Sequence, residues 1–471
     1  MLGVAHYIIA LLVSIRVILR PRLEPTVRLS WILVIELVPL VGVIAYVLFG
    51  EIRVRSAEVS TRASVRSFLS GLWQSSPERV RAPPAFAAPV IAANRAIGGF
   101  EAVAGNRAAL LAEDDDAIDD LVAAIDGAQV HVHILFYIWL DDPSGRKVAE
   151  AAIRAAARGV KVRAIIDAYG SLQFSRSDCW ARMKEAGCEC AEALPLGMPV
   201  IGPLFQRMDL RNHRKIVVID HHLGFTGSRN CADMAFAVKP RYAPWIDVFL
   251  SIEGPVVRQM QAVFLQDWMS YTGEDLGDLL RMVGPVCAPG EIAQVVATGP
   301  DSRQGSLSDA MTTMIYAARE SLTITTPYYV PGSALDAAIR TVARSGIDVT
   351  MILPARSDSL VVQATSEGFY YGLVAAGVKL MLFPGGLLHA KIITVDGCMA
   401  MLGSANLDRR SFELNYEMNM LFLGGDLTAE LDRRQQTYLA RARRLDLDDI
   451  RGWSMWRRLR NNLLALAAPI L

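Results

Sequence analysis

Residues 213–220 read His-Arg-Lys-Ile-Val-Val-Ile-Asp, and residues 227–230 read Gly-Ser-Arg-Asn. Residues 389–396 repeat this stretch as His-Ala-Lys-Ile-Ile-Thr-Val-Asp, with Gly-Ser-Ala-Asn at residues 403–406. Both copies have the spacing H-x-K-x4-D-x6-G-S-x-N. One copy alone would fit a core hairpin with a stray histidine. A second copy with the same spacing makes coincidence improbable, and it predicts a chain built from two related units.

Each copy predicts a β-hairpin with polar side chains at its open end. The β-branched run after the lysine favours a strand, in which the histidine and the lysine share one face. Asp396-Gly397 is a strong two-residue turn signal, whereas Asp220-His221 is a weaker one. The returning strands would bring Ser228 and Ser404 back opposite the two histidines.

The residue types at these open ends suit a phosphodiester. Lysine supplies positive charge, and serine and asparagine supply neutral donors to phosphate oxygens. Histidine can act as a nucleophile or a proton carrier near neutral pH. Two copies that face each other would offer one histidine to attack phosphorus and another to protonate the leaving oxygen.

The paired stretches resemble the HKD motifs of the phospholipase D superfamily, and within it those of the bacterial cardiolipin synthase family. The closer likeness rests on Arg-Asn-His-Arg-Lys at residues 211–215 and on Asn-Leu-Asp-Arg-Arg-Ser-Phe-Glu-Leu-Asn at residues 406–415. It also rests on an N-terminal hydrophobic hairpin, and it covers most of the chain. The resemblance implies transfer of a phosphatidyl group from one phosphatidylglycerol to another, which gives cardiolipin and glycerol through a phosphohistidine.

The resemblance makes His213 the expected nucleophile and His389 the expected acid and base, although the sequence alone does not assign these roles. No carboxylate cluster suggests Mg2+, so neither a metal nor another cofactor is expected. The predicted catalytic set follows the two motifs: His213, Lys215, Asp220, His389, Lys391 and Asp396.

The remaining site residues are predicted from the hairpin geometry. The two lysines would hold the non-bridging oxygens together with Ser228, Asn230, Ser404 and Asn406. The two aspartates lie at the turns, away from the phosphate, and are expected to be structural anchors at the lobe interface. Each histidine also needs an orienting carboxylate, for which Glu417 is the candidate near His389 and Asp247 the candidate in the first lobe.

The duplication extends beyond the motifs. Residues 130–140, 148–158 and 160–167 predict a strand, a helix and a strand, and residues 322–329, 335–344 and 347–353 repeat this order. Both predicted helices contain Ala-Ala-Ile-Arg. We therefore expect an α/β fold of two pseudo-symmetric phospholipase D-type lobes with mixed sheets. The expected divisions are a transmembrane hairpin (1–55), a linker or amphipathic region (56–100), two lobes (101–280 and 281–446) and a basic amphipathic C-terminal segment (447–471).

Two apolar runs, at residues 2–19 and 29–49, predict an N-terminal two-helix transmembrane hairpin. At 1.5 Å per residue, the second run would span roughly 31 Å, enough for a hydrocarbon core. A cleavable signal peptide is the alternative for the first run, but no basic segment precedes it and no small-x-small site closes it. The arginines that flank the runs slightly favour a cytoplasmic catalytic part, in a protein of the bacterial inner membrane.

Bulk composition narrows the alternatives. The chain has 471 residues, 48 basic and 48 acidic, and 52% of them are hydrophobic. The basic and acidic residues balance, whereas binding to a nucleic-acid backbone needs a basic groove. A phosphodiesterase acting on nucleic acid is therefore disfavoured. The main alternative is a membrane-anchored phospholipase D that hydrolyses phospholipids or uses another alcohol. The expected partners are phosphatidylglycerol and anionic membrane lipid, and the sequence predicts no oligomeric state.

Two segments have two interpretations each, and two histidine pairs have one expected role each. The apolar loop at residues 196–205 either packs against the fold or lines an acyl-chain entrance. The segment at residues 453–464 either lies on anionic lipid or docks on the enzyme's own surface. His131 and His133 are expected to be core or edge residues rather than a ligand pair. The other histidine pair, His221 and His222, is expected to be an exposed bystander.

Overall fold

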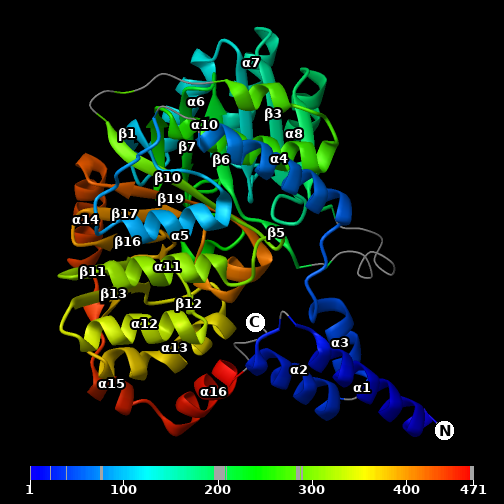
Figure 1. Ribbon diagram of the computed structural model, residues 1–471, viewed down its shortest axis with the longest axis vertical. Helices are drawn as coiled ribbons and strands as arrows, with labels where there is room; N and C mark the ends of the chain where they lie inside the picture. Colours follow the sequence, from blue (N-terminus) through cyan, green and yellow to red (C-terminus); the bar gives the residue numbers. More distant parts are fainter. Residues whose placement is uncertain are drawn as a thin grey trace.

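The computed structural model describes residues 2–21, 23–38, 40–74, 78–195, 207, 209–282, 287 and 290–466. The apolar loop predicted at residues 196–205 lies outside the described residues. The rest forms two α/β lobes, one above the other in Figure 1, with shorter helical segments at each end of the chain.

The two lobes have the same strand order, as the duplication predicts. In the first lobe the strands follow one another across the sheet as β4 (Glu189–Ala193), β3 (Lys161–Asp167), β2 (His131–Phe136), β6 (Lys215–Ile219), β7 (Leu223–Gly227), β9 (Phe249–Glu253) and β1 (Val103–Leu110). The second lobe repeats this order with β14 (Lys379–Phe383), β13 (Asp348–Pro354), β11 (Ser321–Thr325), β16 (Ile392–Val395), β17 (Met399–Gly403), β19 (Asn415–Leu423) and β10 (Glu291–Thr298).

The lobes are joined edge to edge, because β1 pairs antiparallel with β10 and makes one continuous sheet. Within each lobe the three outer strands run parallel and the hairpins are antiparallel; the outer strands are β2, β3 and β4 in the first lobe and β11, β13 and β14 in the second. The mixed sheets of the prediction are therefore confirmed. The edge of the second lobe is extended by β20 (Arg443–Arg444).

Helices follow the same repeat. In the first lobe α6 (Asp116–Gly127) and α7 (Pro143–Ala157) alternate with the strands, and α11 (Ser306–Ala317) and α12 (Ser333–Arg344) do so in the second. The Asp142 carboxylate accepts a hydrogen bond from Gly145 N and so caps α7, whose first residue is proline. Because helices cover it, β2 is buried at every position, as expected of a parallel strand.

The catalytic hairpins have matching turns despite their different sequences. Asp220 and His221 have φ values of 49° and 63°, and Asp396 and Gly397 have values of 51° and 61°. A hydrogen bond closes each turn, from His222 N to the Ile219 carbonyl and from Cys398 N to the Val395 carbonyl. Positive φ at both central residues defines a type I′ turn, which suits the twist of a hairpin. The weaker turn signal in the first motif thus gives the same turn shape.

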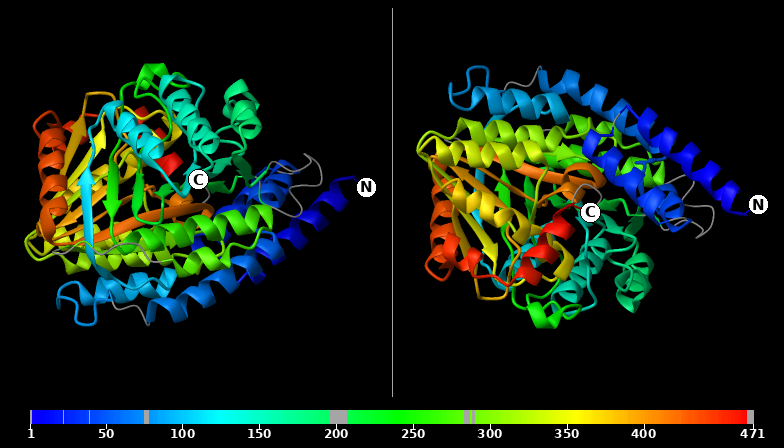
Figure 2. Two further views of the ribbon diagram at one scale, coloured as in Figure 1. Left: turned by 90° about the horizontal axis from the view of Figure 1, so that it is seen from above. Right: turned by 90° about the horizontal axis from the view of Figure 1, so that it is seen from below.

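The region between the N-terminus and the first lobe is helical. Figure 2 shows α4 (Ser56–Gln74) and α5 (Ala88–Gly98) running along one side of the molecule. The first of these packs on α10 (Val256–Thr272), the last helix of the first lobe, whereas α5 packs on β10 and α11 of the second lobe. This segment therefore contacts both lobes before the first lobe begins.

The N-terminal apolar runs form three helices rather than two. They are α1 (Leu2–Leu19), α2 (Pro25–Leu37) and α3 (Val41–Phe49), so the prediction of one continuous helix over residues 29–49 is wrong. The run contains Pro39, and proline lacks the N–H that a helix interior needs. In the part of the chain that the structure describes, no helix combines the length and the apolar character needed to cross a membrane.

The chain ends in α16 (Met455–Leu466), which packs on α13 (Leu360–Ala375). Asn461 Nδ2 donates a hydrogen bond to Glu367 Oε2, and the Arg457 guanidinium pairs with the same carboxylate. The docked interpretation of residues 453–464 is therefore confirmed. The opposite face of the helix still exposes apolar side chains: Met455, Trp456, Leu459, Leu463 and Leu466.

Candidate active site

Each catalytic histidine is held by the backbone of the opposite lobe. His213 N donates to the carbonyl of Tyr416, where β5 (Arg211–Asn212) runs parallel to the start of β19. His389 N donates to the carbonyl of Ile246, where β15 (Leu387–Leu388) runs parallel to β8 (Trp245–Ile246). The segment before each motif thus crosses into the other lobe, and the exchange is reciprocal.

The carboxylates are exchanged in the same way. His213 Nδ1 lies 3.0 Å from Glu417 Oε2, and His389 Nδ1 lies 2.7 Å from Asp247 Oδ1. The expected assignment, with Glu417 near His389 and Asp247 in the first-lobe pair, is wrong. Asp247 directly follows β8, and Glu417 lies near the start of β19. Because each of these strands hydrogen-bonds to the segment before the other lobe's motif, its carboxylate faces the histidine of that lobe. Spacing within a single motif contains no signal for this exchange.

The serines of the motifs bind these carboxylates. Ser228 Oγ donates to Asp247 Oδ1 at 2.6 Å, and Ser404 Oγ donates to Glu417 Oε2. Both hydroxyls also accept a backbone N–H, from Val248 and Met418 respectively, and both serines are fully buried. The prediction that they contact phosphate directly is wrong, because their hydroxyl protons are directed to the carboxylates. They fix the groups that orient the histidines.

The two lysines belong to one electrostatic site. Lys391 Nζ lies 2.9 Å from His389 Nε2, and Lys215 Nζ lies 2.6 Å from the carbonyl oxygen of His213. Lys391 also lowers the pKa of His213, and Lys215 lowers that of His389. Because Glu417 and Asp247 reach the histidines of the opposite lobes, both motifs lie buried at the junction of the lobes, as the paired spacing predicts.

Burial controls the protonation of the two histidines. It lowers the pKa of His213 to about 4 against the opposing effect of Glu417, and it lowers the pKa of His389 against that of Asp247. Burial would raise the pKa of Glu417, but His213 and Lys215 hold it at about 2. At neutral pH the site therefore contains neutral imidazoles held by ionised carboxylates.

Burial also lowers the pKa of the lysines. The pKa of Lys215 falls to about 8 and that of Lys391 to about 7, although the Asp247 and Glu417 carboxylates oppose this change. Two ammonium groups in one buried centre repel each other, and a phosphate between them would relieve that repulsion. The lysine charges are thus positioned for an anion.

The turn aspartates lie at the far ends of the hairpins. Asp220 accepts backbone N–H groups from residues 129–131, and Asp396 accepts them from residues 319–321. Each aspartate comes seven residues after its histidine, at the other end of strand β6 or β16. They tie each turn to the start of the neighbouring strand of the same lobe. The structural role is as expected, but the placement at the lobe interface is wrong.

Comparisons with known proteins agree with this geometry. A family model described as "Cardiolipin synthase, PLD-like domain" matches residues 121–268 and 311–438, more than half of the chain. The chain belongs to this family. A second model, "Phospholipase_D-nuclease N-terminal", matches residues 8–51.

Relatives match over almost the whole length. The chain is 36% identical to cardiolipin synthase A of Yersinia pseudotuberculosis over 473 residues, which cover 98% of this chain and 96% of the relative. It is 35% identical to cardiolipin synthase A of Edwardsiella ictaluri, over 99% of this chain and 97% of the relative. A phosphatidylserine synthase structure from Haemophilus influenzae shares the fold, with a TM-score of 0.60 at 14% identity, over 82% of this chain and all of that chain.

The sequence analysis did not identify the aromatic rings that lie beside the two catalytic histidines. The Tyr137 ring lies 4.6 Å from the His213 ring, and the Trp245 ring lies 4.8 Å from the His389 ring. Tyr137 directly follows β2, which ends at Phe136 rather than at residue 140 as predicted. An aromatic residue at the end of a strand is too common a signal to have identified either one.

A buried charge network behind His213 was also missed. Arg62 of α4 lies 2.5 Å from Asp267 of α10, and its guanidinium stacks 4.1 Å from the centre of the Tyr416 ring. Asp267 also holds Arg214 at 2.7 Å, next to His213. Both partners of the first pair are buried. Helix α4 thus supports the first motif from the side away from the catalytic centre.

Four histidines gather at the turn of the first hairpin. The His131 ring lies 4.2 Å from that of His133 and 4.1 Å from that of His221. His133 has polar neighbours, with Gln261 at 2.8 Å, so the prediction of a core residue is confirmed. His221 and His222 are half-buried, so the expectation of exposed bystanders is wrong.

Proposed function

We propose that this protein is a cardiolipin synthase that moves a phosphatidyl group between two phosphatidylglycerol molecules. The reciprocal pair of imidazole–carboxylate contacts supports this proposal most strongly. It provides two oriented histidines and two lysines in one buried centre, which is what a two-step displacement at a phosphodiester requires. The curated relatives are named for the same activity.

In the first step, His213 acts as the nucleophile. Its Nδ1–H is directed to Glu417, so Nε2 carries the lone pair that attacks phosphorus. The bond between phosphorus and the glycerol oxygen breaks, and His389 Nε2–H gives its proton to that oxygen. The negative charge of the bound phosphodiester raises the pKa of His389, so the imidazolium forms when substrate is present.

The second step reverses the proton transfer. His389 takes the proton of a hydroxyl on a second phosphatidylglycerol, and that oxygen attacks the phosphorus bound to His213. The bond between phosphorus and nitrogen breaks, and cardiolipin leaves. Lys215 and Lys391, with the side-chain amides of Asn230 and Asn406, hold the non-bridging oxygens throughout.

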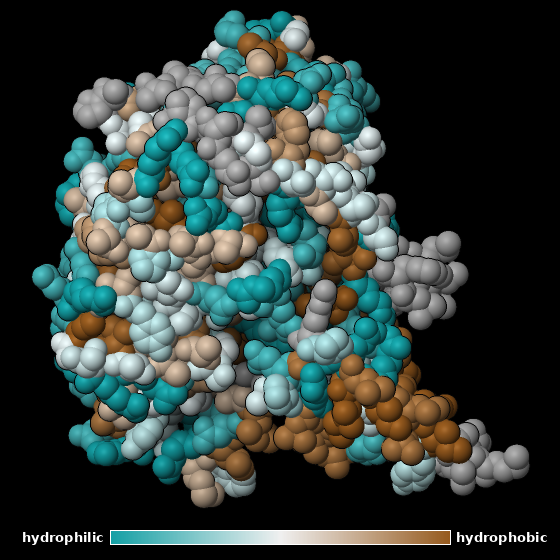
Figure 3. Space-filling view, in the orientation of Figure 1, coloured by the Kyte–Doolittle hydropathy of each residue, from teal (hydrophilic) through white to brown (hydrophobic). Residues whose placement is uncertain are grey.

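Both ends of the chain provide surfaces for lipid. The exposed side of α1 to α3 forms the brown patch at the lower right of Figure 3. Exposed apolar residues of this segment include Leu12, Leu19, Leu37 and Leu40. The apolar face of α16 lies at the same end of the molecule in Figure 1. Its exposed Arg458 and Arg460 suit anionic lipid. We place the enzyme at the bacterial inner membrane, with the N-terminal helices in contact with lipid and the catalytic lobes in the cytoplasm.

One assay tests the reaction. Purified full-length protein in detergent is incubated with labelled phosphatidylglycerol in the presence of a chelator. We expect equal amounts of labelled cardiolipin and glycerol. Phosphatidic acid as the sole lipid product would instead identify a hydrolytic phospholipase D, which uses the same residues with water as the acceptor.

A further inference from the structure

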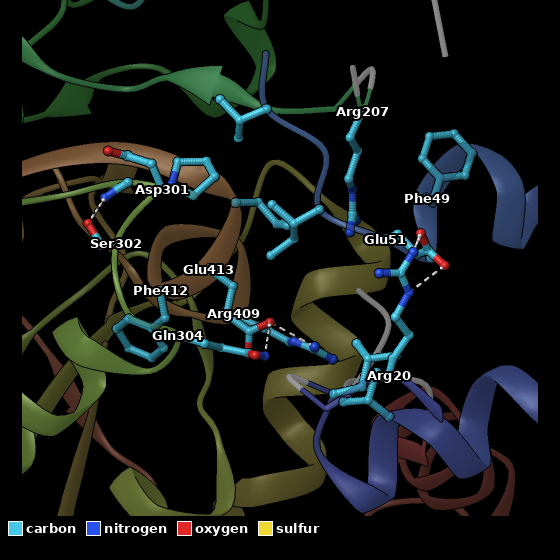
Figure 4. A pocket seen from close by; sticks show the side chains of 18 of the residues that line it. Arg20, Phe49, Glu51, Arg207, Asp301, Ser302, Gln304, Arg409, Phe412 and Glu413 are labelled. Carbon is cyan, nitrogen blue, oxygen red and sulfur yellow. Dashed lines mark hydrogen bonds and ion pairs between the residues drawn. The ribbon is translucent and has the colours of Figure 1, made fainter. Parts of the chain in front are cut away.

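A cavity of about 460 Å³ lies between the N-terminal helices and the catalytic lobes (Figure 4). Its apolar wall includes Val27 and Trp31 of α2, Phe49 of α3, and Phe412 and Leu414, which follow the second motif. A cavity of this size, with apolar walls and a few polar groups, is typical of a small-molecule site. None of the described lining residues is a catalytic histidine, one of the two motif lysines or one of the carboxylates that bind the histidines.

Charged side chains line this cavity. Among the described lining residues are four arginines, Arg20, Arg207, Arg303 and Arg409, and three carboxylates, Glu51, Asp301 and Glu413. Each arginine already pairs with one carboxylate. An anion in the cavity would therefore be held by the guanidinium donors that these pairs leave over.

Three of these arginines have donors to spare. Arg20 binds Glu51 through Nε and Nη2, and Arg207 binds Asp209 through the same two nitrogens. Arg409 binds Glu413 through Nη2, and its buried Nη1 has no hydrogen-bond partner among the described residues. The three come from separate segments and their guanidinium ends converge on the same hollow (Figure 4). The guanidinium donors that remain can bind phosphate oxygens.

The position of the cavity indicates where such a ligand comes from. One wall is built from α2 and α3, whose outer sides carry the exposed apolar patch of Figure 3. The opposite wall includes residues between Arg409 and Leu414, in the segment that directly follows the second motif. The cavity therefore lies between the exposed apolar patch and the segment that follows the second motif.

We propose that this cavity binds one anionic phospholipid, with the phosphate at Arg409 and Arg207 and acyl carbons against Trp31 and Phe412. This inference rests on the proposed use of membrane phospholipids. The site is separate from the two substrate positions at the histidines. It holds a phosphatidylglycerol at the junction of the N-terminal helices and the second lobe.

The test uses the fluorescence of Trp31 in the full-length protein in neutral detergent micelles, with His389→Ala to block turnover. Brominated phosphatidylglycerol and brominated phosphatidylcholine are added at equal mole fraction, and the Trp31 signal is taken as the difference from a Trp31→Phe protein. Loss of a charge-assisted contact changes affinity by about tenfold. We therefore expect phosphatidylglycerol to quench Trp31 at about tenfold lower mole fraction than phosphatidylcholine.

Two variants and a matched control locate the site. Arg409→Gln and Arg207→Gln should each remove most of the preference for phosphatidylglycerol, and having both guards against a folding defect in one. Arg303→Gln is the control, because its side chain is exposed at the rim and pairs with Asp309, so the preference should change by less than about twofold. Equal quenching by the two lipids, or an unchanged preference in both cavity variants, would overturn the proposal.

Activity is measured separately in protein with His389 intact. If cardiolipin forms but Trp31 quenching shows no lipid preference, the site is wrong and the reaction stands. If the preference is present but no cardiolipin forms, the reaction is wrong and the site stands.

Discussion

The two catalytic hairpins share a spacing and a turn, yet only one of their lysines reaches an imidazole. Both lysines donate to the backbone carbonyl of their own histidine at 2.6 Å, but Lys391 also lies 2.9 Å from His389 Nε2. The Nε2 of His213 has no hydrogen bond to a described residue, whereas the Nε2 of His389 sits beside a proton donor. This difference supports the proposed role of His213 as the nucleophile. A duplicated sequence has thus produced two sites with different protonation chemistry.

The largest expected effect separates the two roles. His213→Ala should abolish transfer and give no lipid-labelled protein, because the nucleophile is gone. His389→Ala should slow turnover by about 10²- to 10⁴-fold, the usual contribution of general acid–base catalysis. The labelled phosphatidyl group should then remain attached to this variant, as measured after denaturation. Label on the His213→Ala protein instead would exchange the roles.

A second comparison concerns what lies behind each hairpin. The first is supported by the buried Arg62–Asp267 pair, whereas helix α14 (Gly425–Leu439) offers the second a neutral Gln435, 2.7 Å from Thr394. Arg62→Met should lower the free energy of unfolding by about 3–5 kcal/mol, because it leaves the Asp267 carboxylate with one buried cation fewer. Thermal unfolding measures this loss.

Arg66→Met is the matched control on the same helix. Arg66 pairs with Asp301, but its side chain is partly exposed, so the expected loss is only about 0–1 kcal/mol. Equal losses in the two variants would mean that α4 is anchored along its whole length rather than at Arg62.

The smallest expected effect concerns the turns. Burial lowers the pKa of His131 to about 3, so the unfolded chain binds more protons than the folded protein between pH 3 and 6.5. Stability should therefore fall as the pH drops below 6.5, by roughly 1 kcal/mol per pH unit for this residue. The second turn has Gly397 and no histidine neighbour of this kind.

His131→Leu tests this pH dependence. The drop in melting temperature between pH 6.5 and pH 5.0 should be smaller in the variant than in the original protein. His222→Leu provides the control, since His222 is half-buried and hydrogen-bonds to the Asp220 carbonyl. An identical drop in the variant and the original protein would assign the acid sensitivity to other groups.

Because the sequence repeats, the two lobes could be predicted from it. The contacts between the lobes could not. The motif spacing and the shared Ala-Ala-Ile-Arg helices were enough to predict two mixed-sheet lobes with facing histidines. The partners of Asp247 and Glu417 depend on strands that cross between lobes, which no local pattern records. The predicted contact of the serines with phosphate failed for the same reason, because their hydroxyls bind those carboxylates. Arg62 looked like one of several arginines in a polar helix, since its burial depends on α10.

The reciprocal crossing also limits how the enzyme can admit its substrates. If the lobes swung apart, the β5–β19 and β15–β8 pairings would break, and both histidines would lose their carboxylates together. Two-tailed lipids must therefore reach the phosphorus-binding centre while the halves stay locked. A chain cut between residues 281 and 290 would likewise yield fragments that each hold an imidazole aimed at a missing partner.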